Sequence, residues 1–165
     1  MFSHSDNKTP KGADLAVRRT GAADADVIGR LLHDFNSEFE EPTPGPRALA
    51  DRVRQLLAGD ETVILLAGAG PNGLAVLRFR PSIWTQGLEC YLAELYVQPA
   101  HRRRGLGLAL MAATLELARA EGADYIEVAT SQDDVGARAL YERLGFVNRE
   151  REPDGPVMYV YEREL

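Results

Sequence analysis

Two spacings of hydrophobic residues divide the first part of the chain. Between residues 27 and 57 the apolar positions recur every three or four residues on either side of the sequence EEPTPGP, which predicts two amphipathic helices joined by a loop. Three short apolar runs follow at residues 62–70, 73–80 and 88–97, separated by turn and loop residues. Runs of this length and separation predict an antiparallel β-meander.

The rest of the pattern alternates between helix and strand. Residues 105–122 are apolar on nearly every side, which predicts a helix packed deep against a sheet and ended by Gly122. The pattern then predicts a strand at 125–130, a helix at 136–146 and a final strand at 157–165. A sheet crossed by a deeply packed helix is therefore expected.

The ends of the pattern define the expected domain. Residues 1–13 contain no periodic apolar positions, and we expect them to be disordered. A short strand at 15–19 begins the ordered part, and residues 14–165 are expected to form a single domain without an internal linker. The order of the elements predicts the α/β fold class, with a mixed, mostly antiparallel central sheet flanked by helices on both faces.

The charge and composition of the chain limit its partners and location. The formal net charge is -6 and the isoelectric point is near 5.1, which argues against broad binding to nucleic acid or an anionic membrane. No apolar run approaches the roughly 20 residues that span a bilayer, and the N-terminal residues lack the apolar centre of a signal peptide. The one cysteine, Cys90, is expected in the core. We expect a cytoplasmic protein that needs no metal.

Three arginines and two glycines stand out at Arg102–Gly107, in the sequence RRRGLG. They lie where a predicted strand ends and a long helix begins, and the first turn of a helix leaves backbone N–H groups unpaired at its positive end. Glycines let a ligand approach the backbone, so this segment is a candidate site for phosphate or pyrophosphate. The alternative is a tight turn with solvated arginines.

The surrounding sequence, LYVQPAHRRRGLGLALM, resembles the cofactor motif of the GNAT superfamily of acyl-CoA-dependent N-acetyltransferases. The family pattern is Gln or Arg, two variable residues, Gly, one variable residue, then Gly or Ala, and Arg102, Gly105 and Gly107 fill it. The later segment ATSQDDVGARALYERLGF is also similar to the family, so the resemblance covers residues 88–150. It implies a GNAT-like sheet with a splayed central strand and acetyl-CoA as co-substrate. A Walker-type loop would need Lys and Ser or Thr where Leu108 and Ala109 stand.

The resemblance also implies which residues hold the cofactor. Backbone N–H groups of the loop would bind the pyrophosphate while arginine side chains attract it, and the strand sequence LYV would bind the pantetheine arm and polarise the acetyl carbonyl. A position that is often Asn in the family is Asp134 here, where an N-cap role is equally open. The cofactor-binding residues expected on this basis are Leu95, Tyr96, Val97, Arg102, Arg103, Arg104, Gly105, Leu106, Gly107 and Asp134.

Two catalytic residues are expected. Tyr141 matches the tyrosine that the family uses to protonate the departing thiolate, although its place on an apolar helix stripe also fits simple packing. Glu94 is the candidate general base, acting through a water. Strict strand alternation would put Tyr91, Ala93 and Leu95 on one face and Glu94 on the other, unless a bulge shifts the register. The identity of the base stays open.

The acceptor implied by the resemblance is a primary amine of a small molecule or peptide. Glu38, Glu40 and Glu41 favour a cationic amine, and Trp84 could add an apolar or cation–π wall to the same site. A different class of function, a non-catalytic GNAT-like module that senses acyl-CoA or a small molecule, is the alternative. The sequence does not exclude a homodimer.

Overall fold

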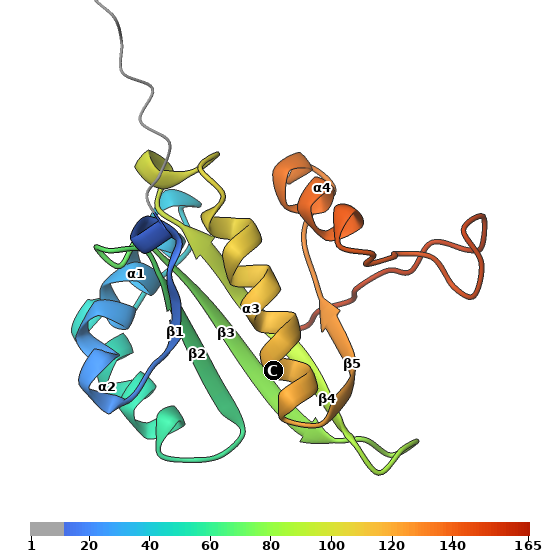
Figure 1. The fold of residues 1–165 in the computed structure, drawn as a ribbon, viewed down its shortest axis with the longest axis horizontal. Coiled ribbons are helices and arrows are strands. Elements are labelled where there is room, and N and C mark those ends of the chain that lie inside the picture. Colours follow the sequence, from blue (N-terminus) through green and yellow to red (C-terminus); the bar gives the residue numbers. More distant parts are fainter. Residues whose placement is uncertain (1–11) are drawn as a thin grey trace, which may run out of the picture. The chain divides into compact units, whose positions relative to one another are not determined.

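The computed structural model describes residues 12–165. These residues divide into two compact units, one ending at Glu127 and the other running from Val128 to Leu165. That residues 14–165 act as a single domain stays a prediction, and the expected disorder of residues 1–13 falls largely outside the described residues. Figure 1 shows the fold, in which a five-stranded sheet is packed against helices.

The sheet has the strand order β1-β2-β3-β4-β5. Its strands are β1 (Val17–Arg19), β2 (Thr62–Ala67), β3 (Gly73–Pro81), β4 (Leu88–Val97) and β5 (Ala123–Val128). The first three pairings are antiparallel. β5 follows a helical crossover from β4 and runs in the same direction (Figure 1), so the sheet is mixed, as predicted.

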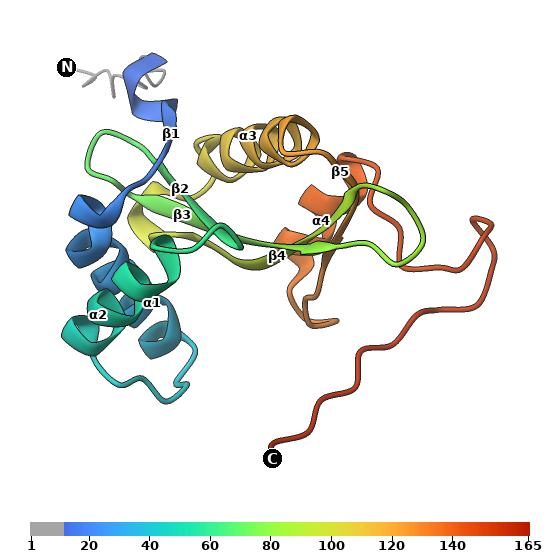
Figure 2. The same ribbon diagram turned by 90° about the horizontal axis from the view of Figure 1, so that it is seen from below.

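Helices cover both faces of the sheet in the first unit. The helices are α1 (Ala25–Glu38), α2 (Pro46–Leu57), α3 (Leu106–Ala120) and, in the second unit, α4 (Val135–Arg143). Figure 2 shows α1 and α2 below the sheet and α3 above it. The ends of β4 and β5 diverge in Figure 1, which agrees with the splayed strand that the resemblance implied.

The face that carries α1 and α2 has its own apolar core. Ile28 and Leu31 of α1 and Val53 of α2 are buried against the sheet residues Leu74 and Tyr96. The two helices approach closely because α1 has Gly29 at their crossing, where an added Cβ would meet the backbone of α2. Burial at about 25 cal/mol per Å² of apolar surface makes this layer a main source of stability.

A β-bulge interrupts β4 at Ala93. Val76 on β3 lies opposite Glu94, while the next residue, Leu77, lies opposite Leu92, so Ala93 has no partner on β3. The extra residue resets the alternation of side chains along β4. Strict alternation of side chains along β4 therefore fails here, because a bulge shifts the register.

The predicted strand at 157–165 is wrong. The described chain forms no strand there, and its pairing is limited to an isolated antiparallel bridge between Arg149 and Val157. The alternating apolar sequence VMYVY fits a strand, but a strand needs a partner, and Tyr159, Val160 and Tyr161 are exposed. Cys90, by contrast, is buried, as predicted, and burial raises the pKa of its thiol to about 11.

Candidate functional site

The candidate cofactor loop joins the end of β4 to the start of α3. A short 3-10 helix, Pro99–His101, turns the chain after β4. Arg103 and Gly105 then take positive φ angles of 62° and 92°. Glycine adopts this backbone conformation without strain, whereas an arginine does so at a cost. The turn brings the chain directly into α3, which begins at Leu106.

The N-terminus of α3 has no side-chain cap among the described residues. Gly105 is the N-cap residue, and its carbonyl accepts the N–H of Ala109 at 2.9 Å. The N–H groups of the first turn are therefore left without a side-chain partner, at the positive end of a 15-residue helix. This arrangement suits an anion such as a pyrophosphate.

The three arginines of the loop differ in their contacts. Arg103 and Arg104 are exposed and form no ion pair with any residue of the described chain. Arg102 instead binds both carboxylate oxygens of Glu38, at 2.6 and 2.7 Å. Since this pair balances the charge of Arg102, the attraction of an anion falls mainly to its two neighbours.

A residue that the sequence analysis missed supports the loop from the β2–β3 turn. The carbonyl of Asn72 accepts the N–H of Gln98 at 2.9 Å. The amide nitrogen of Asn72 lies 3.3 Å from Oε1 of Gln98 and 3.1 Å from Nε2 of His101. The sequence PNG signalled a turn at this place, but no sequence signal indicated that the turn contacts the loop.

Glu94 lies on the face of the sheet that carries α1 and α2. It pairs across the ladder with Val76, whose side chain belongs to the core of that face, as does Tyr96 two residues further on. Burial raises the pKa of the Glu94 carboxyl, and the nearby charge of Arg78 opposes this shift. The bulge thus places a partly buried carboxyl among apolar neighbours, and a raised pKa suits a general base.

The side chains of the strand sequence LYV point to different layers. Tyr96 is 4% exposed and stacks on Phe35 of α1 with ring centroids 5.0 Å apart. Leu95 lies opposite Ala75 on the α3 side. The carbonyl of Val97 accepts a hydrogen bond from Nε of Arg102 at 2.8 Å. A cofactor contact by the backbone of these residues stays a prediction.

The second unit contains the other two candidate residues. Tyr141 is 8% exposed, its ring packs against Phe146, and burial raises its pKa to about 12, with a smaller effect from Asp134. Asp134 caps α4, since its carboxylate accepts the N–H of Ala137 at 2.9 Å. The capping alternative for Asp134 is confirmed, and its role in cofactor binding stays a prediction.

The residues expected to border one acceptor site lie at opposite ends of β4. Glu38 contacts Arg102, whose side chain binds the carbonyl of Val97 at the end of the strand. Trp84 lies in the loop before Leu88, where the strand begins. Ten residues at about 3.3 Å each place these ends about 30 Å apart. The length of β4 weighs against a shared contact, and a place for Trp84 in the acceptor site stays a prediction.

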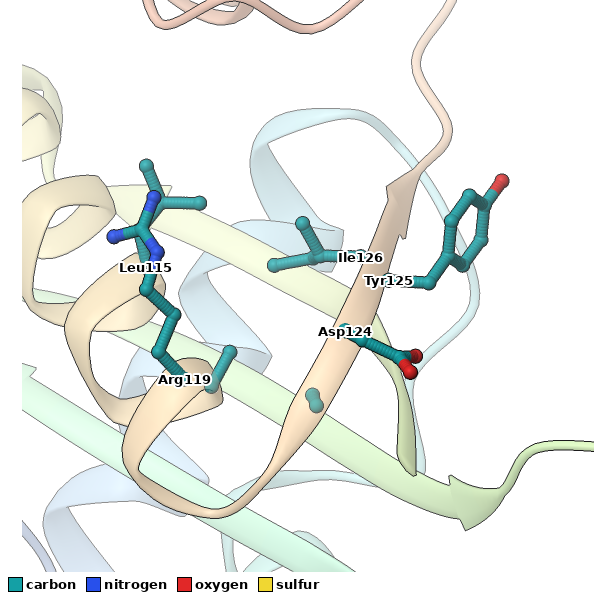
Figure 3. Close-up of a pocket in the computed structure, with 7 residues that line it drawn as sticks. Leu115, Arg119, Asp124, Tyr125 and Ile126 are labelled. Atoms are coloured by element: carbon teal, nitrogen blue, oxygen red, sulfur yellow. The ribbon is translucent and has the colours of Figure 1, made fainter. Parts of the chain in front are cut away.

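A small groove lies at the other end of α3 from the loop. It has a volume of about 150 Å³ and is lined by residues of α3 and β5, among them Leu115, Arg119, Asp124 and Ile126. Figure 3 shows these side chains, with Tyr125 directed away from α3. A helix of 15 residues is about 22 Å long. The groove is therefore separate from the candidate cofactor loop.

The features described above are those of an acyltransferase platform: a mixed sheet, a bulged fourth strand and a glycine turn into an uncapped helix. A family described as the Acetyltransferase (GNAT) family matches residues 28–146. The chain belongs to this family, as the sequence RRRGLG indicated.

The relatives of the chain are acetyltransferases. It is 38% identical over 141 residues to a mycothiol acetyltransferase of Clavibacter sepedonicus, covering 86% of this chain and 45% of the relative. It is 28% identical over 126 residues to thialysine N-epsilon-acetyltransferase of Caenorhabditis elegans, covering 75% of this chain and 78% of the relative. The chain spans about half the length of the mycothiol acetyltransferases that it matches.

Solved structures agree with the fold. A crystal structure from Arthrobacter sp. FB24, assigned as an acetyltransferase, is 46% identical with a TM-score of 0.85 and covers 94% of this chain and 99% of that chain. An aminoglycoside acetyltransferase from an uncultured soil metagenomic sample is 28% identical with a TM-score of 0.68, covering 86% of this chain and 97% of that chain.

Residues 12–165 contain no group of three or more His, Cys, Asp or Glu side chains placed to hold a metal ion. No helix within the same residues is long and apolar enough to cross a membrane.

Proposed function

We propose that the chain transfers an acetyl group from acetyl-CoA to a primary amine of a small molecule or peptide. The observation that carries the proposal is the uncapped N-terminus of α3, which follows Gly105 at positive φ and two exposed arginines that form no ion pair within residues 12–165. Membership of the GNAT family implies acetyl-CoA as the co-substrate.

The residues present fit this co-substrate. The N–H groups of Leu106 and Gly107, in the first turn of α3, would hold the pyrophosphate, with Arg103 and Arg104 adding charge. The backbone of Leu95–Val97 would hold the pantetheine arm. When bound, acetyl-CoA supplies the activated acetyl thioester. The chain itself supplies binding, orientation and proton transfer.

Two side chains would move protons in the reaction. The Glu94 carboxylate would accept a proton from the acceptor amine, directly or through a water, and its raised pKa brings it closer to neutral pH. The Tyr141 hydroxyl stays protonated at neutral pH because burial raises its pKa to about 12, so it can donate to the sulfur of the departing thiolate.

The acceptor class follows from charge and from the relatives. Glu40 and Glu41 are exposed directly after α1, the helix that holds the loop through Glu38. Acidic residues near the site favour a cationic amine. The names of two relatives refer to amine-bearing compounds, thialysine and aminoglycosides. We therefore propose a cationic small-molecule amine as the first acceptor class to test.

Calorimetric titration with acetyl-CoA, followed by thiol release against a panel of amines, tests the proposal. The panel should contain polyamines, aminoglycosides, lysine analogues and short peptides. Binding with turnover is the expected result and names the acceptor class. Binding without turnover of any amine, including after exchange of acetyl for longer acyl groups, would favour the sensing module. Absence of binding would contradict the assignment of the cofactor loop.

Tyr141→Phe is expected to lower kcat by about 10- to 100-fold, because removal of one proton donor costs a fraction of the acid–base contribution. The ring and its contact with Phe146 remain, so acetyl-CoA affinity should not change. Steady-state kinetics and calorimetry check both quantities. The matched control is Tyr125→Phe, an exposed phenol on β5. A normal kcat in Tyr141→Phe would remove Tyr141 from the mechanism.

A further inference from the structure

The ion pair between Arg102 and Glu38 links two parts of the molecule that are 64 residues apart in sequence. We propose that Arg102, held by Glu38, is a positioning residue that fixes the cofactor loop against the end of α1. This inference rests on the proposed function, since it assigns the loop to acetyl-CoA. It differs from the expectation that Arg102 attracts the cofactor by its charge.

The guanidinium of Arg102 is used as a three-point clamp. Its Nε donates to the carbonyl of Val97 at 2.8 Å, and its two terminal nitrogens donate to the two oxygens of Glu38 at 2.6 and 2.7 Å. A planar guanidinium can make all three bonds at once, whereas the single ammonium of lysine cannot reproduce this fork. The clamp therefore depends on arginine and not only on a positive charge.

Arg102 lies against a buried aromatic ring. The guanidinium carbon of Arg102 lies 5.8 Å from the ring centroid of Tyr96, and this ring is buried and stacked on Phe35. Hydrogen bonds from Arg102 lower the pKa of Glu38, so that the carboxylate is ionised at neutral pH. Arg102 is thus held between the end of β4 and the last residue of α1.

The loop residues that follow are held between two anchors. Arg102 is the first anchor, and the second is Leu106, which is 4% exposed at the start of α3. Between them Arg103 keeps a positive φ that costs energy for a residue with a side chain. An anchored loop presents its N–H groups in a fixed arrangement before the ligand binds, which lowers the ordering cost of binding. Loosening the first anchor should therefore weaken binding of acetyl-CoA.

A second ion pair in the same unit provides a matched control. Arg18 binds both carboxylate oxygens of Asp24 at 2.6 and 3.0 Å, and its side chain is exposed like that of Arg102. This pair has the same chemistry but does not contact the loop. A purely structural effect of losing an arginine fork should appear equally in both pairs.

The test compares Arg102→Lys, Glu38→Gln and the double variant with Arg18→Lys. Arg102→Lys is expected to raise Kd and KM for acetyl-CoA by about tenfold, the scale of lost preorganisation, while kcat at saturating acetyl-CoA is unchanged. Glu38→Gln should act in the same direction. The double variant should have the same Kd for acetyl-CoA as Arg102→Lys alone, because both changes break the same set of hydrogen bonds. Arg18→Lys should leave Kd at the wild-type value.

Amide hydrogen exchange of residues 103–107 adds a readout that needs no ligand. It should become faster in Arg102→Lys and in Glu38→Gln, and stay at the wild-type rate in Arg18→Lys. A wild-type Kd and exchange rate in Arg102→Lys would overturn the positioning role, and equal shifts in Arg102→Lys and Arg18→Lys would do the same. If the wild-type protein does not bind acetyl-CoA, the proposed function is wrong, whereas the exchange rates still test whether Arg102 holds the loop. The failure of the proposed function and the failure of the positioning role are therefore distinguishable.

Discussion

Gly107→Glu is expected to weaken acetyl-CoA binding by at least about 100-fold, or about 2.7 kcal/mol. Gly107 lies in the first turn of α3, where the unpaired N–H groups and the positive end of the helix face the proposed pyrophosphate. A glutamate there adds both bulk and a negative charge beside a negatively charged ligand. Acidic residues in a first helical turn are stabilising, so the variant should fold. Calorimetry measures Kd, and circular dichroism checks the fold.

Gly21→Glu is the control for this change, because it makes the same substitution at a distant place. Gly21 has an ordinary φ of -131°, and an added Cβ would meet nothing within 4 Å. The control should bind acetyl-CoA as the wild type does. Wild-type affinity in a folded Gly107→Glu variant would mean that the cofactor binds elsewhere on the chain.

Glu94→Gln is expected to lower kcat by about 10²- to 10³-fold with little change in acetyl-CoA affinity, because general base catalysis contributes on this scale. Wild-type activity should fall as pH falls through the pKa of Glu94, since only the carboxylate accepts a proton. Burial raises that pKa, so the fall should begin at a higher pH than for an exposed glutamate. The pH profile of Glu94→Gln should lack this acidic limb. Stopped assays of thiol release across pH provide the measurement.

The stability of Glu94→Gln gives an independent check with a definite sign. A glutamate whose pKa is raised by folding contributes stability below its unfolded pKa, and this contribution is lost as pH rises through the folded pKa. At neutral pH the ionised Glu94 therefore costs stability, and the glutamine variant should have an equal or higher Tm. Glu116→Gln, an exposed change on α3, should alter neither kcat nor Tm. A Glu94→Gln enzyme with wild-type kcat would transfer the role of base to another group.

Much of the fold was predictable because long periodic segments determine their own structure. The deeply buried α3 and the meander from β2 to β4 match their predicted ranges closely. The final strand was not predictable in the same way, because a strand depends on a partner that the local pattern does not name. The alternating sequence VMYVY favours a strand locally, but the described chain forms no strand there.

The candidate site shows the same division between local and distant information. The glycine turn and the uncapped helix after Arg102 follow from the local sequence RRRGLG, and the comparison with the GNAT family agrees. The partner of Arg102 could not be predicted, since Glu38 lies on another element. The contact of Asn72 with the loop could not be predicted for the same reason. Only the folded chain brings these residues to the loop.

Because of the bulge at Ala93, the number of residues in β4 determines which face of the sheet each side chain of the strand meets. Before it, β4 directs Cys90 and Leu92 to the α3 layer, and after it, Leu95 takes that direction while Glu94 faces the layer of α1 and α2. Gain or loss of one residue in the strand would exchange these assignments and bury the carboxylate in the opposite layer.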